Sequence, residues 1–207
     1  FMNYFKAEKL YLKLNDNYNL AKAFQSKASL QYNEGDFFES EIAVFKALRS
    51  LKGLKNVNNQ LYECYNLLGI LYNEREEYDK ALAYHNKALE ALNDKTIPLE
   101  LQLKATSLNN IGFVYISKKD YKEAKNYFAR GLEQEHLYKE KTVLYAMLLD
   151  NLAYCKFKLN ESDGLPDQFY ASLKIRDSLG LKSGIISSKI HLSEYFAEHK
   201  DTLRAIQ

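Results

Sequence analysis

A pattern of small and aromatic residues recurs along the chain about every forty residues, and this repetition constrains the fold more than any other feature. In each clear copy a glycine is followed three residues later by a tyrosine, and two small residues come after a short polar segment. The two clearest copies are Gly69, Tyr72, Ala81 and Ala88, and Gly112, Tyr115, Ala124 and Gly131. Repetition on this scale is typical of stacked-repeat proteins, in which each unit packs against the next.

Each copy predicts two amphipathic helices, because apolar residues follow helical spacing on both sides of a polar turn such as residues 73–77. The small residues allow two helices to cross closely, since a larger side chain would push their axes apart. We therefore expect Gly69 to face Ala81 and Gly112 to face Ala124. The remaining small residues, Ala88 and Gly131, are expected to let the second helix approach the next unit.

Two segments carry a family resemblance. Residues 68–81, together with Lys87-Ala88-Leu89, resemble a tetratricopeptide repeat, and residues 110–115 with 120–124 are similarly close. The resemblance implies an all-α fold, a right-handed tetratricopeptide-like α-solenoid of antiparallel helix pairs. Such arrays generally bind other chains.

The equivalent small residues divide the chain into units of one array. They are spaced by 40, 43, 41 and 40 residues, from Ser29 through Gly69, Gly112 and Ala153 to Ser193. The usual period is about 34, so the excess is assigned to the connections between units. Pro98 suits a first helical turn and is expected to open the third unit. The predicted boundaries are a partial unit at 1–14, units at 18–52, 58–93, 98–136 and 142–179, and a partial unit at 182–207. The two partial units predict that the chain is a fragment of a longer protein.

Composition excludes several classes of function for this segment. The net charge is +2 with acidic and basic residues interspersed, so the sequence lacks the clustered basic residues with which proteins bind nucleic acids. No apolar run approaches the roughly 18 residues that span a bilayer, so no membrane contact is expected. Cys64 and Cys155 are expected to be core residues too far apart to bridge.

A second stretch resembles a narrower group of proteins. Residues 172–180 and 184–195 are similar to the tetratricopeptide sensor regions of bacterial signalling proteins. In those proteins the array precedes a membrane segment and either a histidine kinase of a two-component system or a helix-turn-helix output module. The resemblance implies a periplasmic sensor region, and a cytoplasmic location stays open.

The first helix of each unit is expected to line a concave groove. Counted from the small residue, the positions three before, one after and four after should point inward. The predicted groove residues are Asn66, Ile70, Asn73, Asn109, Phe113, Ile116, Asp150, Tyr154 and Phe157. Amides beside apolar side chains suit an extended peptide, whether from a partner protein or from an intramolecular segment. Alternatively, Asn66, Asn109 and Asp150 bridge neighbouring helices, while Phe113 and Tyr154 pack on the groove floor.

No group of residues in the sequence has the types and spacing expected of a catalytic, cofactor-binding or metal-binding site. The four histidines, His85, His136, His191 and His199, have no metal-ligand spacing with one another or with a cysteine, and His85 is expected to be a packed, hydrogen-bonded core residue. A clamp for a terminal carboxylate needs inward basic residues, whereas Thr106 and Met147 stand at such positions. The sequence therefore predicts a non-catalytic module that binds a protein or peptide, as the sensor or regulatory region of a bacterial signalling protein. The alternative is a cytoplasmic scaffold or peptide-responsive regulator that mediates complex assembly.

Overall fold

The chain folds into α-helices joined by short turns. The computed structural model describes residues 2–92, 98–135, 142–161 and 164–205, and no strand occurs among them. The predicted all-α class built from antiparallel helix pairs is confirmed. The chain divides into two compact units, Phe1–Lys95 and Thr96–Gln207, which are described one at a time below.

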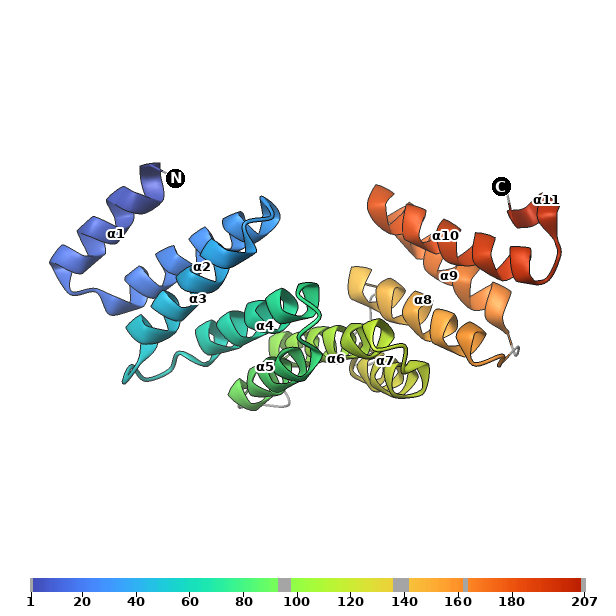
Figure 1. Cartoon of the computed structure of the whole chain (residues 1–207), viewed down its shortest axis with the longest axis horizontal. Coiled ribbons are helices and arrows are strands. Elements are labelled where there is room, and N and C mark those ends of the chain that lie inside the picture. Colours follow the sequence, from blue (N-terminus) through green and yellow to red (C-terminus); the bar gives the residue numbers. More distant parts are fainter. Residues whose placement is uncertain (1, 93–97, 136–141, 162–163, 206–207) are drawn as a thin grey trace. The chain divides into compact units, whose positions relative to one another are not determined.

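The first unit contains two antiparallel helix pairs and one preceding helix. Its helices are α1 (Met2–Leu14), α2 (Asn17–Asn33), α3 (Phe37–Leu51), α4 (Asn58–Glu74) and α5 (Tyr78–Ala91). Helix α2 packs against α3, and α4 packs against α5, while α1 contacts α2 and α3 contacts α4 (Figure 1). The α2–α3 pair spans residues 17–51, and the α4–α5 pair spans residues 58–91.

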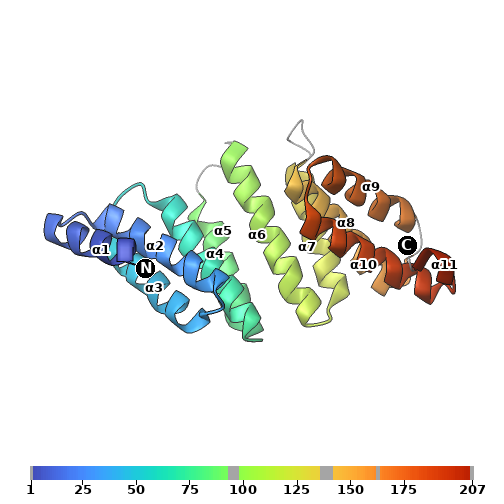
Figure 2. The ribbon, with the colours of Figure 1, turned by 90° about the horizontal axis from the view of Figure 1, so that it is seen from above.

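The second unit continues the same alternation. Its helices are α6 (Pro98–Ser117), α7 (Tyr121–Glu135), α8 (Val143–Lys158), α9 (Leu165–Ser178), α10 (Lys182–Glu198) and the short α11 (Thr202–Ala205). Helix α6 pairs with α7 and α8 with α9, and α10 packs against both α8 and α9 (Figure 2). Helix α6 begins at Pro98, as predicted, because proline needs no backbone hydrogen-bond acceptor in a first turn.

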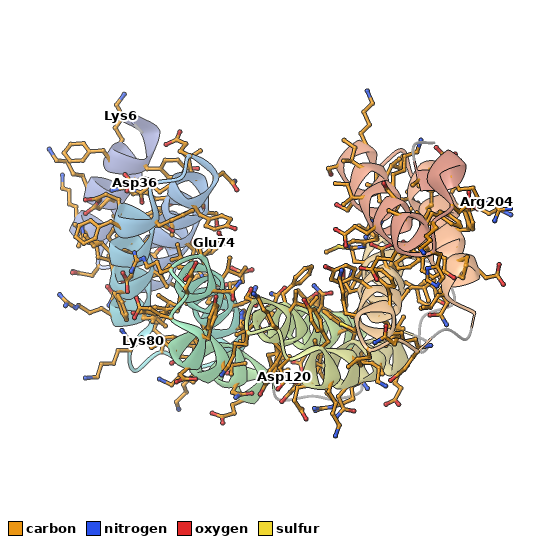
Figure 3. The ribbon with its side chains drawn as sticks, turned by 45° about the vertical axis from the view of Figure 1, so that its right-hand side comes forward. Lys6, Asp36, Glu74, Lys80, Asp120 and Arg204 are labelled. Carbon is orange, nitrogen blue, oxygen red and sulfur yellow. The ribbon has the colours of Figure 1, made fainter. Side chains whose placement is uncertain are left out.

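The turns inside the helix pairs share one geometry. A residue in the left-handed region, with φ of +80° at Gly35 and 60° at Lys119, ends the first helix of the pair. The next residue opens the second helix: the Asp36 amide donates to the Gln31 carbonyl, and the Asp120 amide to Tyr115, both at 2.9 Å. Asp36 and Asp120, labelled in Figure 3, also accept a backbone amide hydrogen bond through their side chains at 3.1 Å. These bonds satisfy amides that a helix start leaves without partners.

The glycines of the repeat mark close contacts between helices. A Cβ added at Gly69 would lie 2.5 Å from Cε1 of His85, and one at Gly112 would lie 2.5 Å from Cε1 of Phe128. The rings of His85 and Phe128, one helical turn after Ala81 and Ala124, therefore lie nearest to the two glycines. That Gly69 faces Ala81 and Gly112 faces Ala124 stays a prediction. Gly131 does approach the next helix pair as predicted, since an added Cβ would lie 2.7 Å from Cδ2 of Leu148 in α8.

Candidate functional site

In the first unit, a cavity of about 230 Å³ lies between α2, α3 and α4. The predicted groove residues Asn66 and Ile70 of α4 line it, together with Gln25 from α2. The Gln25 amide donates to the backbone carbonyl of Gln60 at 2.8 Å, which fixes its side chain across the two helices. Asn73 lies outside this lining, and its buried Oδ1 has no hydrogen-bond partner among the described residues.

In the second unit, a larger cavity of about 330 Å³ is lined by residues of α6, α8, α9 and α10. Two predicted groove residues contribute to it, Phe113 from α6 and Asp150 from α8. Val143 and Met147 extend its apolar wall along α8. The cavity therefore combines an apolar side with a floor of polar and charged groups.

Asp150 is the centre of that floor and is fully buried. Ser188 donates its hydroxyl to Oδ1 at 3.0 Å, and Nδ1 of His191 lies 2.8 Å from Oδ2. Nη1 of Arg176 lies 3.5 Å from the same Oδ2, and only 5% of the Arg176 side chain is exposed. Burial lowers the pKa of Arg176, while the Asp150 carboxylate opposes that shift. This cluster joins α8, α9 and α10 through one carboxylate.

A second polar contact joins α6 to α8. Asn109 is buried, and Nδ2 of Asn151 donates to its Oδ1 at 3.0 Å. Asn109 and Asp150 thus both hold neighbouring helices, as the alternative interpretation of the amide positions expected. A direct ligand contact by either side chain stays a prediction.

The other predicted groove residues of the second unit lie outside the cavity lining. Tyr154 stacks on the His191 ring with centroids 4.4 Å apart. Phe157 is 4% exposed and meets the Tyr195 ring edge-on at 5.6 Å. Ile116 packs, partly buried, against a core cluster that includes Phe128. Tyr154 thus packs on a residue of the cavity lining, whereas Phe157 and Ile116 pack against other residues, and a ligand contact by any of the three stays a prediction.

Sequence reasoning missed several residues of the larger cavity. Met147, one helical turn before Asp150, was expected to point inward but was not counted among the groove residues. Arg176 and His191 also line the cavity, from α9 and α10. The groove residues were counted only on first helices and only at three offsets, so a second-helix residue such as Arg176 could not be found that way.

The described residues offer no sign of metal chemistry or of a membrane span. No group of three His, Cys, Asp or Glu side chains within them could hold a metal ion. No helix in the described ranges is both long and apolar enough to cross a bilayer. Cys64 and Cys155 are buried, as predicted, and burial raises the pKa of each thiol to about 12. Neither thiol is therefore prepared to act as a nucleophile.

His85 packs in the core as predicted, but its hydrogen bonding differs from the prediction. The residue is 1% exposed, and its Nδ1 is buried without a hydrogen-bond partner in the described part of the chain. Burial lowers the pKa of His85 to about 4, so the imidazole is neutral at pH 7. His85 is thus a packing residue and not a candidate ligand.

Comparisons with known proteins define the class. The family model for the tetratricopeptide repeat matches residues 63–92 and 104–133. No curated protein sequence matches the chain. With the antiparallel helix pairs, the match shows that the chain is a helical-repeat protein with a tetratricopeptide-like fold. In particular, α4 with α5 and α6 with α7 are the helix pairs that correspond to the repeat itself.

Solved structures agree on the fold. BtubC from P. vanneervenii superposes with a TM-score of 0.77 at 22% identity, covering 98% of this chain and 82% of that one. Aspartyl phosphate phosphatase F from Bacillus subtilis gives 0.76 at 18%, covering 98% and 61%. The apo quorum sensor NprR from B. thuringiensis gives 0.66 at 17%, covering 98% and 66%. The chain thus spans less than two thirds of the latter two proteins.

Proposed function

We propose that this chain is a non-catalytic module that binds a protein or an extended peptide. The observation that carries the proposal is that predicted groove residues line a cavity in each unit, Asn66 and Ile70 in the first and Phe113 and Asp150 in the second. Both cavities place a half-exposed apolar side chain beside hydrogen-bonding groups. That combination suits a peptide, whose backbone needs polar partners and whose side chains need apolar ones.

We further propose a regulatory role, as the sensor region of a bacterial signalling protein. The resemblance of residues 172–195 to such sensor regions supports it, and a quorum sensor shares the fold. In this mechanism the array has two arrangements of its helix pairs, and the ligand binds one of them more tightly. An output module would respond to the resulting change in the populations of the two arrangements. A ligand can shift such an equilibrium only by its difference in affinity for the two states.

A displayed peptide library tests the binding function directly. The full chain is used as bait, and the peptides it enriches are measured again by fluorescence anisotropy against two variants, Ile70→Asp and Phe113→Asp. Each variant puts a charge on an apolar cavity wall, and we expect at least about a tenfold loss of affinity from one of them. Phe45→Asp is the matched control, since Phe45 is 43% exposed, comparable with the 37% of Phe113, and lies outside both cavities.

Two outcomes would overturn the proposal. If the library yields no enriched peptide, the chain is not a peptide-binding module. If all three variants bind the enriched peptides as the parent chain does, binding takes place on another surface, and the cavities are not the site.

A further inference from the structure

The cavity of the second unit has an apolar wall and a polar floor, and the two differ in accessibility. Phe113 and Val143 are 37% and 44% exposed, so the wall is open to an incoming group. The floor side chains Asp150 and Arg176 are 1% and 5% exposed. A ligand group with an apolar body and a polar end complements this arrangement.

The floor is charge-compensated within the protein. The Asp150 carboxylate lies beside the Arg176 guanidinium, and both are buried. A carboxylate or ammonium group from a ligand would lose its hydration there without meeting an uncompensated opposite charge. The polar end of the ligand should therefore be neutral.

The floor offers both an acceptor and donors. Nδ1 of His191 lies 2.8 Å from a carboxylate oxygen, which favours the tautomer with the hydrogen on Nδ1, and in that tautomer Nε2 is an acceptor. Nη1 of Arg176 bonds the Gly184 carbonyl and the Ser188 hydroxyl, and the guanidinium has further N–H groups on Nε and Nη2. A hydroxyl group, which donates one hydrogen bond and accepts others, matches this set.

The size of the cavity limits the rest of the ligand group. At about 330 Å³ it is at the lower end of ligand cavities, which run from roughly 300 to 1,000 Å³, so it suits one large side chain. The wall contains an aromatic ring and a thioether, Phe113 and Met147, and both pack well against another aromatic ring.

Tyrosine is the large amino-acid side chain that ends in a neutral hydroxyl. We propose that this cavity takes a tyrosine side chain of the bound peptide, with the ring against Phe113 and Met147 and the hydroxyl between His191 and Arg176. This inference rests on the proposed peptide-binding function and specifies one residue of the ligand. It assigns His191 and Arg176 as the residues that select the hydroxyl.

Methyl-labelled methionine gives a direct measurement, because the chain has two methionines, Met2 in α1 and Met147 at the cavity. The full labelled chain is titrated with N-acetyl-tyrosinamide and, separately, N-acetyl-phenylalaninamide. We expect both amides to shift the Met147 methyl signal saturably and to leave the Met2 signal unchanged. The tyrosine amide should bind about 3- to 10-fold more tightly, the range of one net hydrogen bond.

Two variants separate the floor from the wall. His191→Phe keeps an aromatic ring against Tyr154 but removes the acceptor. The tyrosine and phenylalanine amides should therefore bind this variant with about equal affinity. His191→Phe also removes a hydrogen-bond partner of Asp150, so a second variant, Val143→Trp, tests the apolar wall separately. Val143 is a half-exposed residue of the apolar wall, so a tryptophan there should take up space in the cavity and weaken both amides by about tenfold or more. Leu99→Trp, at an exposed position of α6 outside the lining, should change neither.

Equal affinities for the two amides, or a Met147 signal that does not respond, would overturn the inference. If library peptides bind the chain while Met147 stays silent, the cavity inference fails and the proposed function survives. If the tyrosine amide binds at Met147 but no peptide is enriched, the cavity takes an isolated tyrosine-like molecule and the proposed peptide-binding function fails.

Discussion

Helix pairs α4–α5 and α6–α7 share one sequence pattern, but a different aromatic ring packs against the glycine of each pair. Gly69 lies against the His85 imidazole, and Gly112 lies against the phenyl ring of Phe128. The tyrosines near each glycine are alike. Two tyrosines stack across each crossing, Tyr72 on Tyr84 at 5.3 Å and Tyr115 on Tyr127 at 5.4 Å.

In both pairs a flat ring lies opposite a residue without a Cβ, and a Cβ added at either glycine would lie less than 3 Å from the nearest ring atoms. The polar ring in the α4–α5 pair carries a cost, since Nδ1 of His85 is buried without a partner in the described residues. Phe128 fills the equivalent position with no polar atom, so the α6–α7 pair should be the more stable and the less sensitive to pH.

Removing the ring should have the largest effect. Phe128→Ala is expected to cost about 4 kcal/mol, because it leaves a cavity at a fully buried site. His85→Ala should cost less, about 2 kcal/mol, since it also removes the unpartnered nitrogen. Hydrogen exchange of the α7 and α5 amides measures each local opening free energy. Phe113→Ala, at a 37% exposed site, is the control. A loss as large as that of Phe128→Ala would show that burial does not set the difference.

Filling the glycine position should come next. Gly112→Leu and Gly69→Leu are each expected to cost about 3 kcal/mol, because the new side chain meets a buried ring that has no free space to move into. Thermal unfolding checks both, with Glu74→Leu at an exposed position of α4 as the control. An unchanged melting temperature for either glycine variant would disprove the crossing described here.

The pH dependence should distinguish the two pairs. The pKa of His85 falls from 6.5 to about 4 on burial, so the unfolded chain binds a proton between these values and the folded chain does not. The contribution of His85 to the free energy of unfolding should therefore be constant above pH 6.5 and fall by about 3 kcal/mol between pH 6.5 and pH 4.

The variant His85→Phe should remove this part of the pH dependence and bring α4–α5 closer to α6–α7. Urea unfolding followed by circular dichroism at several pH values gives the difference between the parent chain and the variant. His199→Phe is the control, because His199 is exposed. If the two histidine variants lose the same pH dependence, the buried imidazole is not its source.

The smallest effect concerns the start of the second helix. Asp120 caps α7 by accepting the Glu123 amide at 3.1 Å, whereas Glu77 makes no side-chain cap to α5. Glu77→Asp should therefore stabilise α4–α5 by about 0.5 kcal/mol, the value of a cap minus that of the exposed Glu77–Lys80 ion pair. Asp120→Ala should cost about 1 kcal/mol, and thermal unfolding of both variants tests the pair. A destabilised Glu77→Asp variant would contradict the assignment.

Local patterns sufficed for the helices and their pairing. Apolar spacing, polar turns and Pro98 depend on residues close in the chain, so their consequences were predictable from the sequence. The partner of each glycine was not, because Ala81 and His85 lie one turn apart on the same helix face. Only the crossing point of two packed helices decides which of them meets Gly69.

The residues of the candidate site also fall into those that local patterns predicted and those that they did not. Asn66, Ile70, Phe113 and Asp150 were predicted from their offsets to the small residues, and they do line cavities. Arg176 and His191 were not, because they reach Asp150 from positions 26 and 41 residues further along the chain. No local pattern shows that three polar side chains this far apart in the chain will meet.

The sequence alone determined that this protein is an array of paired helices, because the period of its small and aromatic residues sets where each helix begins and which face it buries. The tertiary structure decided which ring fills each glycine crossing and which charges meet at Asp150. Both outcomes depend on contacts between helices, where a shift of one turn exchanges one side chain for another without changing the pattern along the chain.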